Sequence, residues 1–313
     1  MVRIDFMKTF IEVVNAGSLK KAAKNLGMSV SSVSFQINAI EKFYGAKLLE
    51  RNVNGVELTD EGKIALKNME TIVSSVEEAR KLIINIKGEK ITIASGMVGI
   101  NVVYEIQTLL RTKYPEIDVR VELRGAHECI RGVINGTYDF AIVGDILKEH
   151  LDSDRLFVEE IGEDMLVLVV PNDHPLARKD VITVNDVIKE PIISLTDDYG
   201  ITTSLKKALA ASGVRYDDLN ISYVVSDFFS QINGVSNGIG IAITSYIAAC
   251  RACEVGMIKI KKIEGFKAKR KVYFVATKLS MESNRIKKYA NLIIENGKTL
   301  FANFAEMCLF QVF

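Results

Sequence analysis

The segment from residue 18 to residue 59 constrains the fold of this 313-residue chain more strongly than any other stretch. Apolar residues recur there at helical spacing, so two short helices would pack together across a tight turn. They are Ala22, Ala23, Leu26, Met28, Val33, Ile37 and Ile40. Small polar residues lie along the second helix, namely Ser29, Ser31, Ser32, Ser34 and Gln36. The major groove of DNA admits a helix with an apolar back and a small polar front, so this segment predicts DNA binding.

The elements around this pair of helices also follow a recognisable order. An opening helix (Asp5–Asn15) comes first, Gly17-Ser18 precedes the second helix, and a short ribbon follows the third. The ribbon contains Leu48, Leu49, Arg51, Gly55, Val56, Leu58 and Thr59. On these residues the segment resembles the winged helix-turn-helix of LysR-type transcriptional regulators, and the resemblance in pattern extends to about residue 295.

The resemblance implies an α/β protein whose operator binding is modulated by a small-molecule effector. A winged helix-turn-helix would span residues 1–58, a long dimerising linker helix 59–87, and a two-lobed, Rossmann-like effector domain of the periplasmic-binding-protein type 91–300. Lobe I would comprise residues 91–163 and 268–300, and lobe II residues 164–267. The tail, 301–313, is open between a packed helix or strand, an oligomer contact and a disordered end.

The resemblance also places DNA contacts on the third helix. Ser29 would cap this helix and suit a phosphate at its N-terminus. Where the family usually has Gln-Pro and Ser-Arg, this chain has Val30-Ser31 and Ser34-Phe35. The missing arginine removes the commonest specific contact with guanine, so we expect an A·T-leaning site with Phe35 against thymine methyl groups. The alternative is that Phe35 is buried between helices.

Three further side chains complete the predicted DNA surface. Gln36 would bind adenine if it faces the groove. Arg51 would reach from the wing to the minor groove or its flanking phosphates, or would instead pair with Glu50 or Glu41. Lys24 would contact phosphate rather than a base.

Charge and cysteine content narrow the class of protein further. Residues 1–51 carry eight basic and four acidic side chains, a balance of +4, which fits phosphate contacts but also an ordinary solvated surface. Four scattered cysteines are too few for a disulfide scaffold. The N-terminus shows no signal peptide, and no apolar run reaches the ~18 residues of a membrane span. We therefore expect a cytoplasmic protein that does not contact a membrane.

Residues 59–86 carry a heptad pattern. Thr59 would cap a helix, and apolar residues then recur in alternating steps of four and three, at Ala65, Met69, Ile72, Val76, Ala79, Ile83 and Ile86. A narrow apolar stripe needs a partner, so we expect Met69, Ile72, Val76 and Ile83 to pair two protomers. The alternative is a helix packed on its own domain. A two-fold dimer, or a tetramer as is common in the family, would read a two-fold operator.

After residue 90 strands and helices alternate, which predicts parallel sheets in two lobes. Ligands of such sheets bind at the carboxyl ends of strands and at helix N-termini. The rule selects three loops and, within them, the predicted effector-binding residues Ser95, Gly96, Met97, Asp145, Ser194, Thr196, Thr202 and Thr203. We expect a small carboxylate or other anion, although Asp145, Asp197 and Asp198 would favour an amine, and Ser95 and Thr202 could simply cap helices.

No residue pattern indicates an enzyme, a metal or a cofactor. Cys250 and Cys253 lack a second pair of ligands, and helical spacing explains them. Two alternatives stay open, a solute-binding protein without DNA function and an enzyme with an accessory DNA-binding head. The predicted partners are double-stranded operator DNA, the effector and further copies of the chain.

Overall fold

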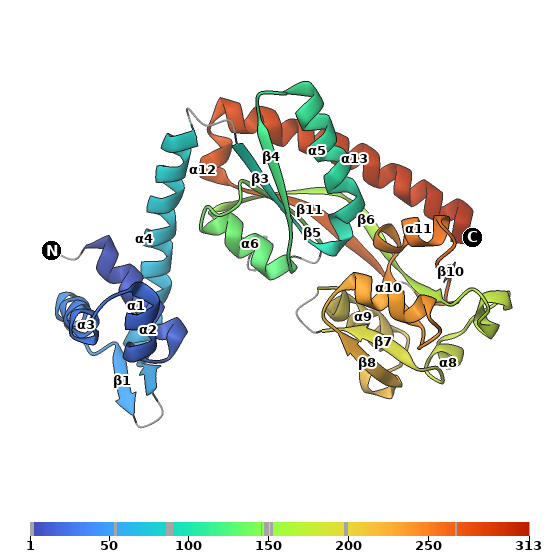
Figure 1. Ribbon diagram of the computed structural model, residues 1–313, viewed down its shortest axis with the longest axis horizontal. Helices are drawn as coiled ribbons and strands as arrows, with labels where there is room; N and C mark the ends of the chain where they lie inside the picture. Colours follow the sequence, from blue (N-terminus) through green and yellow to red (C-terminus); the bar gives the residue numbers. More distant parts are fainter. Residues whose placement is uncertain are drawn as a thin grey trace. The chain divides into compact units, whose positions relative to one another are not determined.

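The computed structural model describes residues 3–52, 55–85, 90–144, 146, 150, 153–196, 200–266 and 268–312. The chain divides into two compact units, Met1–Ile86 and Lys87–Phe313 (Figure 1). No helix among the described residues is long and apolar enough to cross a membrane. The predicted hinge at residues 87–90 lies almost entirely outside the described residues.

The first unit consists of four helices and a two-stranded antiparallel ribbon. Its elements are α1 (Ile4–Ala16), α2 (Leu19–Leu26), α3 (Val30–Tyr44), β1 (Leu49–Asn52), β2 (Gly55–Leu58) and α4 (Asp60–Asn85). The first three helices each end at a glycine with positive φ, namely Gly17, Gly27 and Gly45. Glycine adopts this conformation without steric cost, so these residues fix where the helices stop.

The core of the first unit is built from the predicted apolar positions and from α1. Ala22, Val33 and Ile37 are buried together with Phe10 and Val13 of α1. Leu26, which we expected between the helices, is instead exposed.

Helix α4 lies in two different environments along its length. Its first turns pack on α1, and Ala65 and Met69 lie in the core of this unit with Met69 fully buried. Further along, Ile72 and Val76 are exposed and Ile83 is 68% exposed. The prediction that Met69 pairs protomers is therefore wrong, because its side chain already contacts its own domain. Only the later part of the stripe is free to meet a partner.

The second unit is built on a seven-stranded sheet and a two-stranded sheet. The larger sheet runs β10-β6-β11-β5-β3-β4, with β9 also paired to β6; β7 and β8 form the smaller, parallel sheet. The strands are β3 (Lys90–Ser95), β4 (Asp118–Leu123), β5 (Phe140–Gly144), β6 (Leu156–Val170), β7 (Ile192–Leu195), β8 (Ile221–Val225), β9 (Ala242–Ser245), β10 (Lys259–Lys261) and β11 (Lys269–Thr277).

Helices cover both faces of the sheet in lobe I. Ala141 and Val143 of β5 pack toward α6 (Ala126–Ile134), whereas Ile142 between them approaches Gly99 at the start of α5 (Ile100–Lys113). Alternate side chains of one strand thus serve two helix layers. The remaining helical segments are η1 (Met97–Gly99), η2 (Pro175–Arg178), α8 (Val184–Val187), α9 (Gly200–Ala211), η3 (Tyr216–Asp218), α10 (Phe228–Ser236), α11 (Tyr246–Glu254), α12 (Lys278–Met281) and α13 (Asn284–Val312).

Two long antiparallel strands, β6 and β11, connect the lobes (Figure 1). The first part of β6 pairs with β11, and its last residues pair with β9 and β10 in lobe II. We expected parallel strands and a strand only from Met165, but β6 begins at Leu156. Charged residues interrupt the apolar pattern in its first half, which hid it from a hydrophobicity criterion.

The C-terminal tail is helical. Helix α13 continues to Val312 rather than ending near Glu295, and Phe301 and Phe304 are buried. Gly162 of β6 permits this packing, since an added Cβ there would lie 2.3 Å from the Phe301 Cβ. The start of the tail, at Phe301 and Phe304, therefore packs on the second unit, and the tail extends its last helix.

Candidate DNA interface and anion pocket

The start of α3 presents small and apolar side chains to solvent. Ser29 caps the helix, because its Oγ accepts the Ser32 backbone N–H at 3.1 Å. Val30 and Ser31 are exposed and Ser34 is half-buried. These three residues, Val30, Ser31 and Ser34, line a shallow hollow between α2, α3 and the wing. The other residues that line the hollow are Ser18, Leu19, Lys20, Gly55 and Val56. This arrangement suits a helix that enters a groove beside a flanking ribbon.

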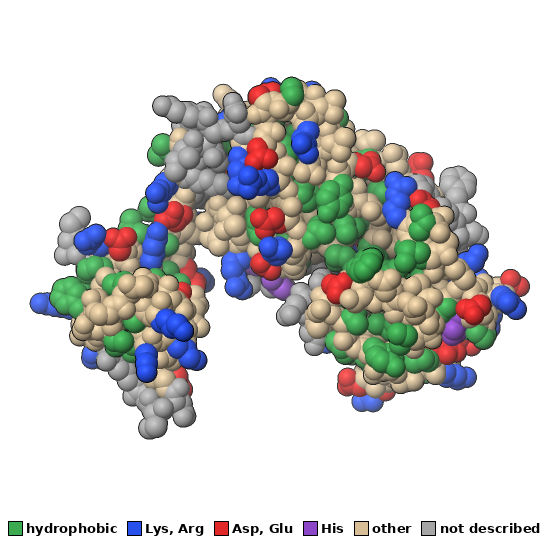
Figure 2. All heavy atoms as spheres, in the orientation of Figure 1, with side chains coloured by type: hydrophobic (Ala, Val, Ile, Leu, Met, Phe, Trp, Pro, Cys, Tyr) green, Lys and Arg blue, Asp and Glu red, His purple; other side chains and the backbone are tan. Residues whose placement is uncertain are grey.

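Phe35 lies on this outward surface and is 67% exposed. Its ring meets Phe6 edge to face, with centroids 6.3 Å apart. The alternative of a ring buried between helices is thereby excluded, and Phe35 is free to contact a base methyl group. Lys24 is also exposed, and Figure 2 shows several further Lys and Arg side chains on this unit.

Gln36 does not face outward. It is half-buried, and its amide oxygen is enclosed without a hydrogen-bond partner among the described residues. A bidentate contact with adenine needs that oxygen, so the predicted role of Gln36 is corrected. The residue follows Phe35 by one position and is rotated toward the core side of α3.

The base of the wing is held by Glu41, a residue that sequence reasoning assigned only as a possible partner of Arg51. Its carboxylate accepts hydrogen bonds from Lys47 Nζ at 2.8 Å, from Leu48 N at 3.0 Å and from Leu49 N at 3.3 Å. Burial raises the pKa of Glu41, but these hydrogen bonds outweigh burial and lower the pKa below its ordinary value. The side chain of Arg51 lies outside the described residues, so its predicted DNA contact stays a prediction.

A small pocket lies where the two lobes meet, and we call it the anion pocket. It is lined by the starts of η1, α6 and α9, by the end of β5 and by two arginines. The lining residues are Gly96, Met97, Val98, Arg124, Gly125, Ala126, Gly144, Gly200, Ile201 and Arg270. None of these described lining residues is acidic. Two guanidinium groups beside backbone N–H groups at helix starts favour a negatively charged ligand.

Arg270 is held in place from behind by a buried carboxylate. Its Nε and Nη2 atoms each lie 2.9 Å from Asp164 Oδ2, and the two side chains are 5% and 0% exposed. The other oxygen of Asp164 accepts the Ile247 N–H of α11 at 3.3 Å. Because β6 supplies Asp164 and β11 supplies Arg270, this ion pair lies on the two strands that connect the lobes.

Two of the predicted effector-binding residues, Gly96 and Met97, line the anion pocket, but the predicted hydroxyl groups do not. The Ser95 hydroxyl donates to Gly96 O at 2.9 Å and is fully buried. The Thr202 hydroxyl donates to Thr196 O at 3.3 Å. Both hydroxyls therefore donate to neighbouring backbone carbonyls, which is neither the predicted ligand contact nor the helix cap that we gave as the alternative.

The remaining predicted residues lie elsewhere. Ser194 is buried, with its Oγ 2.8 Å from the Tyr216 hydroxyl, and Thr196 donates its backbone N–H to Val225 O at 3.1 Å. Thr203 is exposed without lining the pocket, and Asp145 lies outside the described residues. The start of α9 reaches the pocket through Gly200 and Ile201, two residues earlier than we expected.

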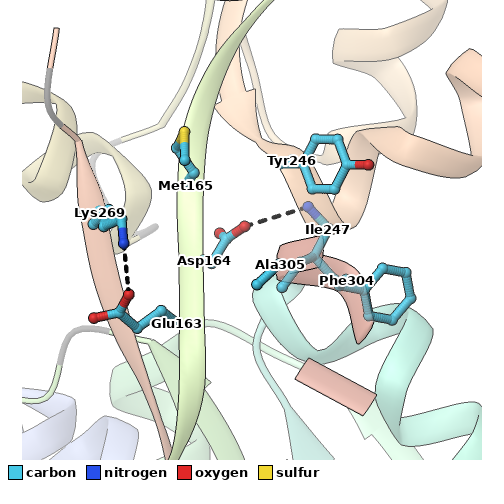
Figure 3. Close-up of a pocket in the computed structure, with 8 residues that line it drawn as sticks. All are labelled: Glu163, Asp164, Met165, Tyr246, Ile247, Lys269, Phe304 and Ala305. Atoms are coloured by element: carbon cyan, nitrogen blue, oxygen red, sulfur yellow. Dashed lines mark hydrogen bonds and ion pairs between the residues drawn. The ribbon is translucent and has the colours of Figure 1, made fainter. Parts of the chain in front are cut away.

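A second, more apolar pocket lies beside the connecting strands (Figure 3). Its apolar lining residues are Met165, Tyr246, Ile247, Phe304 and Ala305. Two acidic residues, Glu163 and Asp164, also line it, and its cation Lys269 is paired with Glu163, so this pocket is a weaker candidate for the predicted anion.

Two of the four cysteines, Cys129 and Cys250, offer no reactive thiolate. Burial raises the pKa of Cys129 to about 12 and that of Cys250 to about 11, so both are protonated thiols near neutral pH. Within the described residues no three His, Cys, Asp or Glu side chains gather in a way that would hold a metal ion.

Known proteins match both units. Residues 4–63 match the bacterial regulatory helix-turn-helix protein model of the lysR family, and residues 89–298 match the LysR substrate binding domain. An uncharacterized HTH-type transcriptional regulator, MJ0300 of Methanocaldococcus jannaschii, is 31% identical over 291 residues, which cover 92% of this chain and 97% of that protein.

Solved structures share the fold. Full-length CbnR complexed with its target DNA has a TM-score of 0.54 at 19% identity and covers 95% of this chain and 100% of that chain. The effector binding domain of QuiR in complex with shikimate has a TM-score of 0.59 at 21% identity, covering 69% and 100%. The helix-turn-helix match excludes a solute-binding protein without DNA function, and the matched families are regulators rather than enzymes. The predicted fold class and function are confirmed, and the chain belongs to the LysR family of transcriptional regulators.

Proposed function

We propose that this regulator responds to a small organic anion that binds in the anion pocket. The observation that carries the proposal is the lining of that pocket, where Arg270 and Arg124 meet three helix starts and none of the described lining residues is acidic. The carboxylates that pair with these arginines, Asp164 with Arg270 and Glu122 and Glu128 with Arg124, do not line the pocket. Shikimate, present in the QuiR structure, is itself a small carboxylate and supports this class of ligand.

The proposed mechanism follows from which lobe supplies each lining residue. Met97 and Arg124 belong to lobe I, Ile201 belongs to lobe II, and Arg270 lies on a connecting strand. A ligand that contacts all of them stabilises the arrangement in which the lobes are close. It changes DNA binding only if that arrangement has a different affinity for the operator.

We propose that copies of the chain associate through the free part of α4. Ile72, Val76 and Ile83 expose their side chains along it. Exposed apolar side chains on lobe II, Tyr223 of β8 and Phe229 of α10, offer a second contact that would convert dimers into tetramers. A two-fold assembly fits a two-fold operator. In this cytoplasmic protein residues 1–58 would read the operator, residues 59–87 would pair the protomers and residues 91–300 would control DNA binding.

The anion pocket is tested by a charge change at its rim. In the full-length protein Arg124→Gln should weaken the binding of an effector carboxylate about tenfold, since one charged hydrogen-bond donor is lost. Arg120→Gln is the matched control, because Arg120 also pairs with a neighbouring acid, at 2.9 Å from Asp118, but does not line the pocket. Thermal shift over a carboxylate panel identifies a binding anion, and an electrophoretic mobility shift on the promoter beside the gene reports its effect. Equal affinity in both variants would refute the site.

A further inference from the structure

A second basic hollow adjoins the anion pocket. It is an open groove, and Arg270 lines both spaces. We call it the lysine groove, because among its lining residues are Lys207, Lys269 and Lys271. Its other walls are Ile146, Ser204, Ala208, Ala211, Ala268 and Tyr273.

The groove exists because β5 is shorter than β11. Strand β5 ends at Gly144, opposite Val272, so residues 269–271 of β11 have no β5 partner along that edge. Helix α9 faces this edge with Ser204 and Lys207. The groove therefore lies between the connecting strand and lobe II, on the same side of β11 as the end of β5 that lines the anion pocket.

The charges of the groove are unequally compensated. Lys269 pairs with Glu163 at 3.0 Å and Lys271 with Glu160 at 2.6 Å, and the pKa of Lys271 is raised by that hydrogen bond. Lys207 is exposed and has no ion-pair partner within the described part of the chain. None of the described residues that line the groove is acidic. The local charge is thus positive, and Lys207 is the cation still available to a ligand.

We infer that the effector carries two anionic groups, one held in the anion pocket and the other in the lysine groove by Lys207. This inference rests on the proposed function, since it extends the same site past Arg270. The ligand class is a small dicarboxylate, or a molecule with a phosphate or phosphonate at one end and a carboxylate at the other.

The positions of the anion pocket and the lysine groove explain why both lobes would respond to a bound effector. Lys207 lies on α9 of lobe II, and Arg124 lies beside α6 of lobe I. A ligand with one anionic group engages one of these ends, whereas a ligand with two groups bridges them. The second group adds a contact without a second loss of translational freedom, so its effect on affinity is large.

The experiment compares matched acids on the full-length protein by isothermal titration at constant ionic strength. The probes are succinate, glutarate and adipate against butyrate, and 3-phosphonopropionate against propionate. We expect at least one dianion to bind at least tenfold more tightly than its matched monoanion. Lys207→Gln should remove this difference between dianion and monoanion, while Lys207→Arg should retain it.

Lys259→Gln is the control for a general loss of positive charge, because Lys259 is an exposed lysine of lobe II outside the groove. It should leave both affinities unchanged. Equal binding of monoanions and dianions to the wild type would overturn this inference and leave the anion pocket standing. So would a dianion preference that survives Lys207→Gln. If no anion of the panel binds at all, the proposed function fails and this inference fails with it.

Discussion

The buried ion pair between Asp164 and Arg270 makes a quantitative prediction. Asp164→Asn keeps the shape of the side chain and an oxygen that can still accept the Ile247 N–H, but it leaves the Arg270 guanidinium without its counter-charge. Since the two side chains are 0% and 5% exposed, water cannot replace the lost partner. Removing one member of a buried pair costs about 3–5 kcal/mol of unfolding free energy.

Scanning calorimetry of the full-length protein measures this cost. The second unit is large enough that 1 kcal/mol shifts its Tm by about 2–4 °C, so Asp164→Asn should lower Tm by about 6–20 °C. Adding Arg270→Met should recover most of the loss, because the uncompensated charge is then gone. Glu160→Gln is the matched control. It breaks the exposed pair of Glu160 with Lys271 on the same two strands and should cost less than about 1 kcal/mol.

Two results would refute this reasoning. A Tm for Asp164→Asn within about 2 °C of the wild type would mean that the guanidinium is hydrated or has moved. A double variant less stable than Asp164→Asn alone would mean that Arg270 stabilises the fold by packing rather than through its charge.

Three further predictions concern other parts of the chain. Phe35→Ala should weaken operator binding in a mobility shift while changing stability by less than about 0.5 kcal/mol, because the ring is exposed; unchanged DNA affinity would remove Phe35 from the interface. The lowered pKa of Glu41 means that its stabilisation is present above its ordinary value of 4.5 and is lost as pH falls through the lower folded value. Urea unfolding should therefore show a loss of stability at acid pH that is smaller in Glu41→Gln. Ile83→Glu should shift the oligomer toward smaller species in analytical ultracentrifugation, and an unchanged mass would contradict a dimer contact on α4.

The helices of the first unit could be predicted from the sequence because their signals are local. Gly17 and Gly27 stop helices through their own backbone conformation, and the apolar spacing of Val33 and Ile37 depends only on nearby residues. Which part of the long apolar stripe is buried depends on residues far away in the sequence. Met69 belongs to the same heptad pattern as Ile83, and only the position of α1 decides which of them is covered by the chain itself.

The anion pocket was predicted in part, and the reason lies in what the strand-end rule specifies. The rule selects loops, and it correctly led to Gly96 and Met97 and to the start of α9. It does not specify side-chain directions, and the hydroxyls of Ser95 and Thr202 bind neighbouring backbone instead. A hydroxyl beside a helix start has backbone acceptors within reach, so local satisfaction competes with ligand binding at every such position.

Arg270 required the three-dimensional register of two strands. It pairs with a carboxylate 106 residues away, and that pairing depends on an irregularity in which Val272 lies opposite Gly162 but Tyr273 lies opposite Glu160. Ile161 is thus an extra residue in β6, as in a β-bulge. If Ile161 instead paired regularly with Val272, the register beyond it would shift by one and Arg270 would lie opposite Glu163 instead of Asp164. A shift of one residue also exchanges the two faces of a strand. Since composition and spacing contain no marker of this bulge, the cation that gives the pocket its charge can be recognised only once the strands are paired.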